Sequence, residues 1–160
     1  MERKTINFLV NDLHASQLSY YLTRNVNEYI KNDPSLDFVV FFENLSKPVL
    51  VPNFALMQVA EAWGQPGVSI ATSLTTASRL IHFPAPSKKF FYVWDLEWLR
   101  PTNKVYDLYA GIYLHPELKL LARSEEHASL IKNSFNRSVE AIVSDFDISK
   151  ILEVSNHGSH

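Results

Sequence analysis

The 160-residue sequence contains no cysteine. Disulfide frameworks, thiolate metal sites, iron–sulfur centres and cysteine nucleophiles are therefore excluded. Glycine is also scarce: the four glycines stand at positions 64, 67, 111 and 158. The sequence thus contains neither the G-x-G-x-x-G loop of dinucleotide-binding domains nor a Walker A loop. These absences remove disulfide scaffolds and the two glycine-loop nucleotide-binding motifs.

Long apolar runs and a strong charge imbalance are missing too. The longest near-continuous apolar stretches, such as residues 38–42, are far shorter than the roughly 20 residues of a membrane span. Asn11, Asp12 and His14 interrupt the first apolar run too early for a secretory signal. With 15 Lys and Arg against 17 Asp and Glu, the net charge of −2 argues against nucleic acid as a general electrostatic partner. We expect a cytoplasmic protein with no membrane partner.

The composition that remains is that of an ordinary globular domain. Hydrophobic residues make up 46% of the chain and charged residues 20%. A chain of this length buries roughly two thirds of the surface that it exposes when unfolded. We expect one domain over residues 1–154 and a tail over 155–160, of which Gly158, Ser159 and His160 resemble the start of an expression tag.

Strand-like and helix-like patterns alternate along the chain. Apolar runs predict strands over residues 6–10, 36–42, 68–71, 89–94, 118–122 and 139–143. Helical periods predict helices over 17–32, 74–81, 106–114 and 125–135, with a short terminal piece over 148–154. Ser16, Ser73 and Ser124 stand as hydroxyl caps before three of these helices. Residues 54–63 fit either a strand or a short helix; a strand followed by an irregular turn is favoured.

The alternation predicts a fold class. Strands separated by helices form a parallel sheet with helices on both faces, because each crossover carries its helix over one face. We therefore expect an α/β protein with a single Rossmann-like three-layer domain and a mostly parallel sheet.

Polar side chains follow each predicted strand. In an open parallel sheet the carboxyl ends of the strands meet at one edge, where ligands bind. Strand ends are also polar because they face solvent, so a structural explanation competes for each residue. The side chains that the rule gathers as candidate ligand-binding groups are Asn11, His14, Thr72, Ser73, Glu97, Ser124 and Glu125, and Trp98 stands next to Glu97.

Asp95 has the most distinctive setting among these residues. It follows the most aromatic strand and lies between Trp94 and Trp98, whose indoles would shield its carboxylate from water and favour a role as general base. Flat indole faces also stack on sugar rings or nucleobases. The alternative is that the indoles fill the space between sheet and helix while the acid is a solvated cap.

The histidines do not predict a metal site. His82, His115 and His127 share no spacing typical of metal ligands, so we expect no metal and no cofactor. His14, in the loop after the first strand, can donate to an anion or act as a base, although a lone loop histidine is also explained by solvent exposure.

Residues 90–98 followed by residues 118–127 resemble the amino-terminal half of a GT-B glycosyltransferase. In that family an aromatic-rich strand that closes on an aspartate precedes a strand whose serine opens a helix, and the phage DNA glucosyltransferases show a similar order. The resemblance extends over residues 5–150. It implies a Rossmann-like acceptor-binding domain in which Asp95 takes the position of the catalytic base.

The same resemblance implies a partner. A GT-B enzyme has two Rossmann-like domains, and the second, which mainly holds the nucleotide-sugar donor, has no counterpart here. A second domain or subunit would then bring the donor. The competing hypothesis is a non-catalytic binding or interaction module with the same fold, since this fold serves many functions. A flavodoxin-like or nucleotide-binding protein is disfavoured by the missing glycine loop. A homo-oligomer is expected if a large apolar flank is left exposed.

Overall fold

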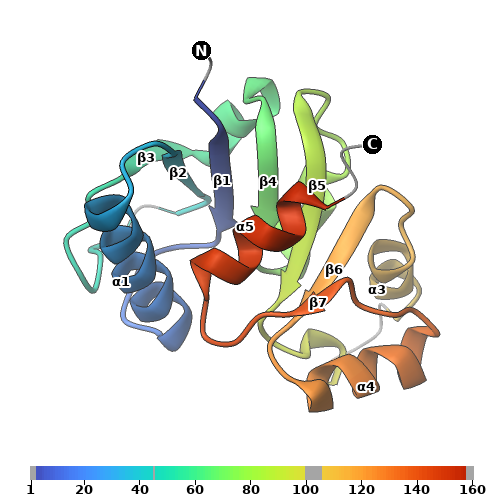
Figure 1. The fold of residues 1–160 in the computed structure, drawn as a ribbon. Coiled ribbons are helices and arrows are strands. Elements are labelled where there is room, and N and C mark those ends of the chain that lie inside the picture. Colours follow the sequence, from blue (N-terminus) through green and yellow to red (C-terminus); the bar gives the residue numbers. More distant parts are fainter. Residues whose placement is uncertain (1–2, 45, 100–105, 158–160) are drawn as a thin grey trace.

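The computed structural model describes residues 3–44, 46–99 and 106–157 (Figure 1). Seven strands form one sheet in the order β3-β2-β1-β4-β5-β6-β7, and every neighbouring pair runs parallel. Helices cover both faces of this sheet (Figure 1). The expected single Rossmann-like α/β domain is confirmed. None of the helices in the described ranges combines the length and the apolar character needed to cross a membrane.

The strands are β1 (Thr5–Val10), β2 (Asp37–Phe42), β3 (Ala55–Gln58), β4 (Gly67–Ala71), β5 (Pro86–Val93), β6 (Leu118–Ala122) and β7 (Ala141–Ile142). The helices are α1 (Gln17–Asn32), α2 (Leu74–Leu80), α3 (Tyr106–Tyr113), α4 (Glu125–Phe135) and α5 (Ile148–Asn156). The described residues also form two 3₁₀ turns, η1 (Val59–Gly64) and η2 (Glu97–Leu99).

Several boundaries differ from the expected ones. The open segment 54–63 contains β3 followed by η1. β5 begins three residues early, at Pro86, which pairs with Gly67 at the first position of the strand, where a proline is tolerated. β7 has two residues instead of the expected five, and α5 continues through Asn156 into the expected tail. Residues 158–160, compared above with an expression tag, lie outside the described residues.

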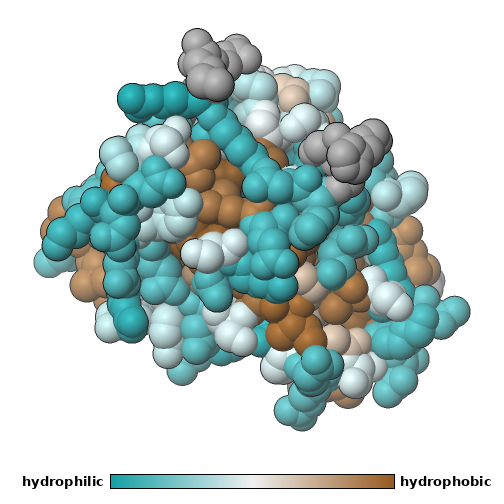
Figure 2. Space-filling view, viewed as in Figure 1, coloured by the Kyte–Doolittle hydropathy of each residue, from teal (hydrophilic) through white to brown (hydrophobic). Residues whose placement is uncertain are grey.

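Two apolar clusters hold the layers together. On one face, α1 and α5 lie side by side over the sheet and bury side chains such as Leu22 and Ile151 against Phe8 (Figure 1). Apolar residues are still visible between the two helices on this face (Figure 2). On the other face, η1, α2, α3 and α4 pack on Leu9 and Phe91. The clusters account for the strands that are apolar on both faces, because each face has its own cover.

The sheet changes its direction of growth between β3 and β4. From β1 the chain adds β2 and β3 on one side, then crosses to the other side of β1 and adds β4 to β7 in sequence. Because parallel crossovers are right-handed, α1 and α2 leave the adjacent strands β1 and β4 toward opposite faces. A crevice between the loop after β1 and the loop after β4 follows from this topology.

Gly67 starts β4 where that strand comes close to β1. Its φ angle is +99°, and a Cβ atom at this position would lie 2.5 Å from the carbonyl oxygen of Thr5. Only glycine combines this backbone conformation with so close an approach. Glycine at this position lets β4 begin beside β1 without a steric clash.

We predict that Gly67→Ala lowers the free energy of unfolding by about 1–3 kcal/mol or more, because it combines a positive φ with a backbone clash. The matched control is Gly64→Ala, since nothing lies within 4 Å of a Cβ at Gly64. Urea denaturation of both variants measures the difference. Equal stability of the two variants would contradict the close approach described here.

Tyr92 fastens the loop that leads from β7 into α5. Its hydroxyl donates to the carbonyl oxygen of Val143 and accepts from the backbone N–H of Phe146 at 3.4 Å. The rings of Tyr92 and Phe146 pack edge to face, with centroids 4.8 Å apart. Asp145 and Phe146 both have positive φ, at 48° and 57°, so the turn needs this support.

Burial, the largest cause, raises the pKa of Tyr92 to about 12. The unfolded chain ionises a phenol near pH 10, so the stability from the neutral phenol is complete below pH 10 and is lost as the pH rises toward 12. Between pH 10 and 12 we predict that the free energy of unfolding falls less in Tyr92→Phe than in the wild type, by roughly 2–3 kcal/mol, because the variant has no phenol at this position. At neutral pH the same substitution lowers the free energy of unfolding by about 1–3 kcal/mol, because the Val143 carbonyl loses the hydroxyl that donates to it. Denaturation from pH 8 to 12 measures both effects, with the exposed Tyr20→Phe as control.

Candidate functional site

A cleft of about 510 Å³ opens at the carboxyl ends of β1, β4 and β5. It lies over the crevice where the sheet changes its direction of growth. Three segments line it: Asn11, Asp12, His14 and Ser16 after β1 with Gln17 and Leu18 at the start of α1, Thr72 and Ser73 after β4, and Trp94, Asp95 and Glu97 after β5.

The structure brings most of the candidate residues together in this cleft. They are Asn11, His14, Thr72, Ser73, Asp95 and Glu97. The remaining three are not among the described residues that line it: Trp98, Ser124 and Glu125. Trp98 is buried and packs edge-on against Tyr113 and Phe135, with centroid distances of 5.0 Å in both cases. Ser124 caps α4 by accepting from the backbone N–H of His127 at 3.2 Å.

The expectation that two indoles shield Asp95 is wrong. Trp94 packs in the cluster beneath α1 and α5, whereas Trp98 packs in the cluster on the opposite face. The η2 turn that follows Asp95 carries the chain across the end of the sheet, so the indoles diverge and the Asp95 side chain is exposed. Trp98 therefore offers no stacking face to a ligand.

Trp94 contributes to the cleft in a way that the sequence did not reveal. The guanidinium carbon of Arg123 lies 3.7 Å from the centroid of its ring, so a cation covers one indole face. Tyr21 of α1 packs against the same indole at a centroid distance of 6.2 Å. Because these partners come from α1 and from the loop after β6, only the sheet order brings them together.

Asp12 and His14 form a pair in the loop after β1. Oδ1 of Asp12 contacts Nδ1 of His14 and accepts the backbone N–H of His14 at 3.3 Å. A carboxylate on Nδ1 orients the imidazole and leaves Nε2 as the nitrogen that can exchange a proton with a ligand. The role of Asp12 was missed, although an acid two residues before a loop histidine was a usable signal.

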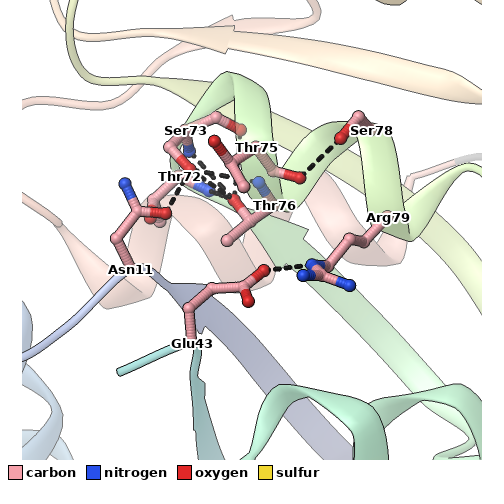
Figure 3. A network of polar contacts seen from close by, with 8 residues as sticks. All are labelled: Asn11, Glu43, Thr72, Ser73, Thr75, Thr76, Ser78 and Arg79. Atoms are coloured by element: carbon pink, nitrogen blue, oxygen red, sulfur yellow. Dashed lines mark hydrogen bonds and ion pairs between the residues drawn. The ribbon is translucent and has the colours of Figure 1, made fainter. Parts of the chain in front are cut away.

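The hydroxyls after β4 are engaged in structural contacts (Figure 3). Thr72 donates to the carbonyl oxygen of Leu9 at 2.8 Å, and Ser73 donates to Oδ1 of Asn11 at 3.0 Å. Both residues are nearly buried. Thr72 and Ser73 thus shape the cleft, and they tie the end of β4 to the end of β1.

Two carboxylates hold α2 in place. Oε1 of Glu97 accepts the backbone N–H of Leu74 at 3.0 Å, which joins η2 to the first turn of α2. Glu43, which follows β2, forms an ion pair with Arg79 of the same helix (Figure 3). These contacts fix two sides of the wall that α2 contributes near the cleft.

The cleft is more acidic than basic. Its lining includes the carboxylates of Asp12, Asp95 and Glu97, with His14 as the titratable base among the described lining residues. A phosphate would face a net negative field at this place. In the described parts of the chain no group of three or more His, Asp or Glu side chains stands together as a metal site. Neutral ligands rich in hydrogen-bonding groups fit these side chains better than anions.

Comparison of the chain with protein-family models, with curated proteins and with solved structures returned no match.

We predict that Glu97→Ala lowers the free energy of unfolding by about 1 kcal/mol, because the backbone N–H of Leu74 loses its acceptor. Glu61→Ala, an exposed acid in η1, is the control. Chemical denaturation compares the two variants. Equal stability of Glu97→Ala and the control would contradict a stabilising role of this hydrogen bond.

Proposed function

We propose that this chain is the acceptor-side half of a GT-B-type glycosyltransferase, and that its cleft binds the hydroxyl-bearing acceptor. The observation that carries the proposal is the position of Asp95: an exposed carboxylate in a polar cleft, at the change of direction of a parallel sheet. Ligands of such sheets bind at this place. The parallel α/β fold, which the resemblance to GT-B glycosyltransferases implies, supplies further support.

The donors and acceptors of the cleft suit a hydroxyl group. A hydroxyl both donates and accepts a hydrogen bond. The carboxylates of Asp12 and Asp95 accept, whereas the amide of Asn11 and the imidazole of His14 can donate. A sugar ring presents several such hydroxyls on a small scaffold, which matches a cleft of about 510 Å³.

Asp95 would act as general base. As the acceptor oxygen attacks the anomeric carbon of an activated sugar, an oxygen of Asp95 takes the hydroxyl proton. The new bond joins the acceptor oxygen to that carbon, and the nucleoside diphosphate leaves with the electron pair of the bond that breaks. Proton transfer of this kind contributes roughly 10²–10⁴-fold. The donor would be held by a second domain or subunit, which would also cover Asp95 from water.

A non-catalytic binding module is the second candidate. The observation that favours it is the use of the polar groups: Thr72, Ser73 and Glu97 each hold the fold together. In this version the cleft binds a hydroxyl-rich ligand without a reaction, and Asp95 is a hydrogen-bond acceptor.

We predict that the protein binds methyl glycosides in this cleft. Titration of ¹⁵N-labelled protein with methyl glycosides of glucose, galactose and mannose should shift the backbone resonances of residues 11–18 and 94–97. Asp95→Asn should weaken binding by about tenfold, because a charge-assisted hydrogen bond is lost. Asp147→Asn, at the cap of α5 and outside the cleft lining, is the control.

Incubation with nucleotide sugars and the same glycosides, followed by mass spectrometry, separates the two candidates. A transferred sugar with wild type and none with Asp95→Asn supports the enzyme. Binding without transfer, for every donor tried, favours the module. If no glycoside shifts any cleft resonance, both candidates are wrong.

A further inference from the structure

The side chain of Thr76 determines where the neighbouring hydroxyl protons go. Its Oγ1 accepts the backbone N–H of Thr72 at 3.2 Å and that of Ser73 at 3.0 Å, which uses both lone pairs. Its own proton goes to the carbonyl oxygen of Ser73 at 3.1 Å. Thr76 is fully buried and its hydroxyl is saturated.

Because the Thr76 hydroxyl is saturated, the hydroxyl proton of Ser73 has one acceptor left. Its Oγ accepts the backbone N–H of Thr76 at 3.1 Å and has two oxygens within reach, Oγ1 of Thr76 and Oδ1 of Asn11, both at 3.0 Å. Because Oγ1 of Thr76 has no lone pair left, the proton of Ser73 goes to Asn11. We call this chain of hydrogen bonds, from Thr76 through Ser73 to the side-chain carbonyl of Asn11, the Thr76–Ser73 relay (Figure 3).

The relay orients the amide of Asn11. With the amide turned over, Nδ2 would donate to Ser73, and the proton of Ser73 would have only the saturated Thr76 oxygen to go to. The observed orientation avoids that lost hydrogen bond. Nδ2 lies on the side away from Ser73 (Figure 3), and it makes no hydrogen bond within the described part of the chain. Asn11 is exposed and lines the cleft.

We propose that Asn11 is the specificity-determining donor of the cleft. Its Nδ2, held in orientation by the Thr76–Ser73 relay, donates to the oxygen of a ligand hydroxyl, while the proton of that hydroxyl goes to a cleft carboxylate such as Asp95. This inference rests on the proposed function and narrows its ligand to a hydroxyl oxygen. Ser73 and Thr76 are positioning residues, because they act on the ligand only through Asn11.

The relay is tested without a ligand. We expect ¹⁵N relaxation of the Asn11 side-chain amide to show a rigid group in the wild type and a mobile one in Ser73→Ala, with rigidity retained in Ser73→Thr. Ser78→Ala, in the helix that Ser73 caps, is the matched control, since among the described residues its hydroxyl bonds only within α2, to the carbonyl of Thr75 at 2.7 Å. An amide that stays equally rigid in Ser73→Ala overturns the relay.

The donor role is tested with methyl glycosides of glucose, galactose and mannose, and with inorganic phosphate. Asn11→Asp keeps the acceptor for Ser73 and removes the donor, so α2 stays capped even where Ser73→Ala fails to fold. We expect about tenfold weaker glycoside binding in Asn11→Asp, the loss of one good hydrogen bond. Asn44→Asp controls for charge: Asn44 is exposed and its backbone N–H donates to the Asn11 carbonyl at 2.9 Å.

The outcomes distinguish the donor role of Asn11 from the proposed function of the cleft. Glycoside shifts at the Asn11 amide, with weaker binding in Asn11→Asp and unchanged binding in Asn44→Asp, support the inference. Glycoside shifts at His14 and Asp95 with equal binding by Asn11→Asp overturn it and leave the proposed function standing. No glycoside shift anywhere in the cleft overturns both, whether or not phosphate shifts the Asn11 amide.

Discussion

The crossovers of a parallel sheet are right-handed, and this sheet changes its direction of growth once, between β3 and β4. Neighbouring strands on the two sides of that change must send their helices to opposite faces. The loops therefore separate at the carboxyl ends of β1 and β4. Further down the sheet the two strands are joined by Asn7, whose Nδ2 donates to the carbonyl of Pro66 at 3.1 Å and to Oγ of Ser69 at 3.3 Å. The cleft is a consequence of connectivity before any of its side chains is considered.

The side chains of the cleft divide into two groups by their environment. The hydroxyls of Thr72, Ser73 and Thr76 are buried, and their hydrogen bonds join the first turn of α2 to the ends of β1 and β4. The carboxylate of Asp95 and the amide of Asn11 are exposed at the surface of the same cleft. Buried polar groups must be satisfied within the protein, whereas exposed ones are also in contact with water and can exchange that water for a ligand. This division explains why a cleft built from many polar residues offers few to a ligand.

Local signals in the sequence predicted much of the fold. Ser16, Ser73 and Ser124 cap their helices as expected, because a cap is decided within a few residues of itself. The gathering of polar strand ends at one edge followed from the parallel alternation. The faces of Trp94 and Trp98 were not predictable in the same way. Trp94 continues the alternation of Phe90 and Tyr92 onto one face, and a single short turn then places Trp98 on the other.

Contacts between loops that are distant in the chain could not be predicted from the sequence. Arg123 reaches Trp94 only because β5 and β6 are neighbours, and sheet order has no local signal. The Asp12–His14 pair is local but depends on rotamers that a pattern does not encode. The two-residue length of β7 reflects pairing on one side only, at the edge of the sheet, which apolar character alone overestimates.

The last helix has a consequence for the order in which the domain is completed during translation. α5 covers the face over β1, β4 and β5, and two lysines hold its end. Lys4, just before β1, donates to Oγ of Ser155 at 3.3 Å, and Lys88 of β5 donates to the Ser155 carbonyl. While residues 148–156 are still inside the ribosome, α1 alone covers this face, and the part of it that α5 will cover is open to water. Apolar surface that is covered late in synthesis is open to non-specific association in the meantime.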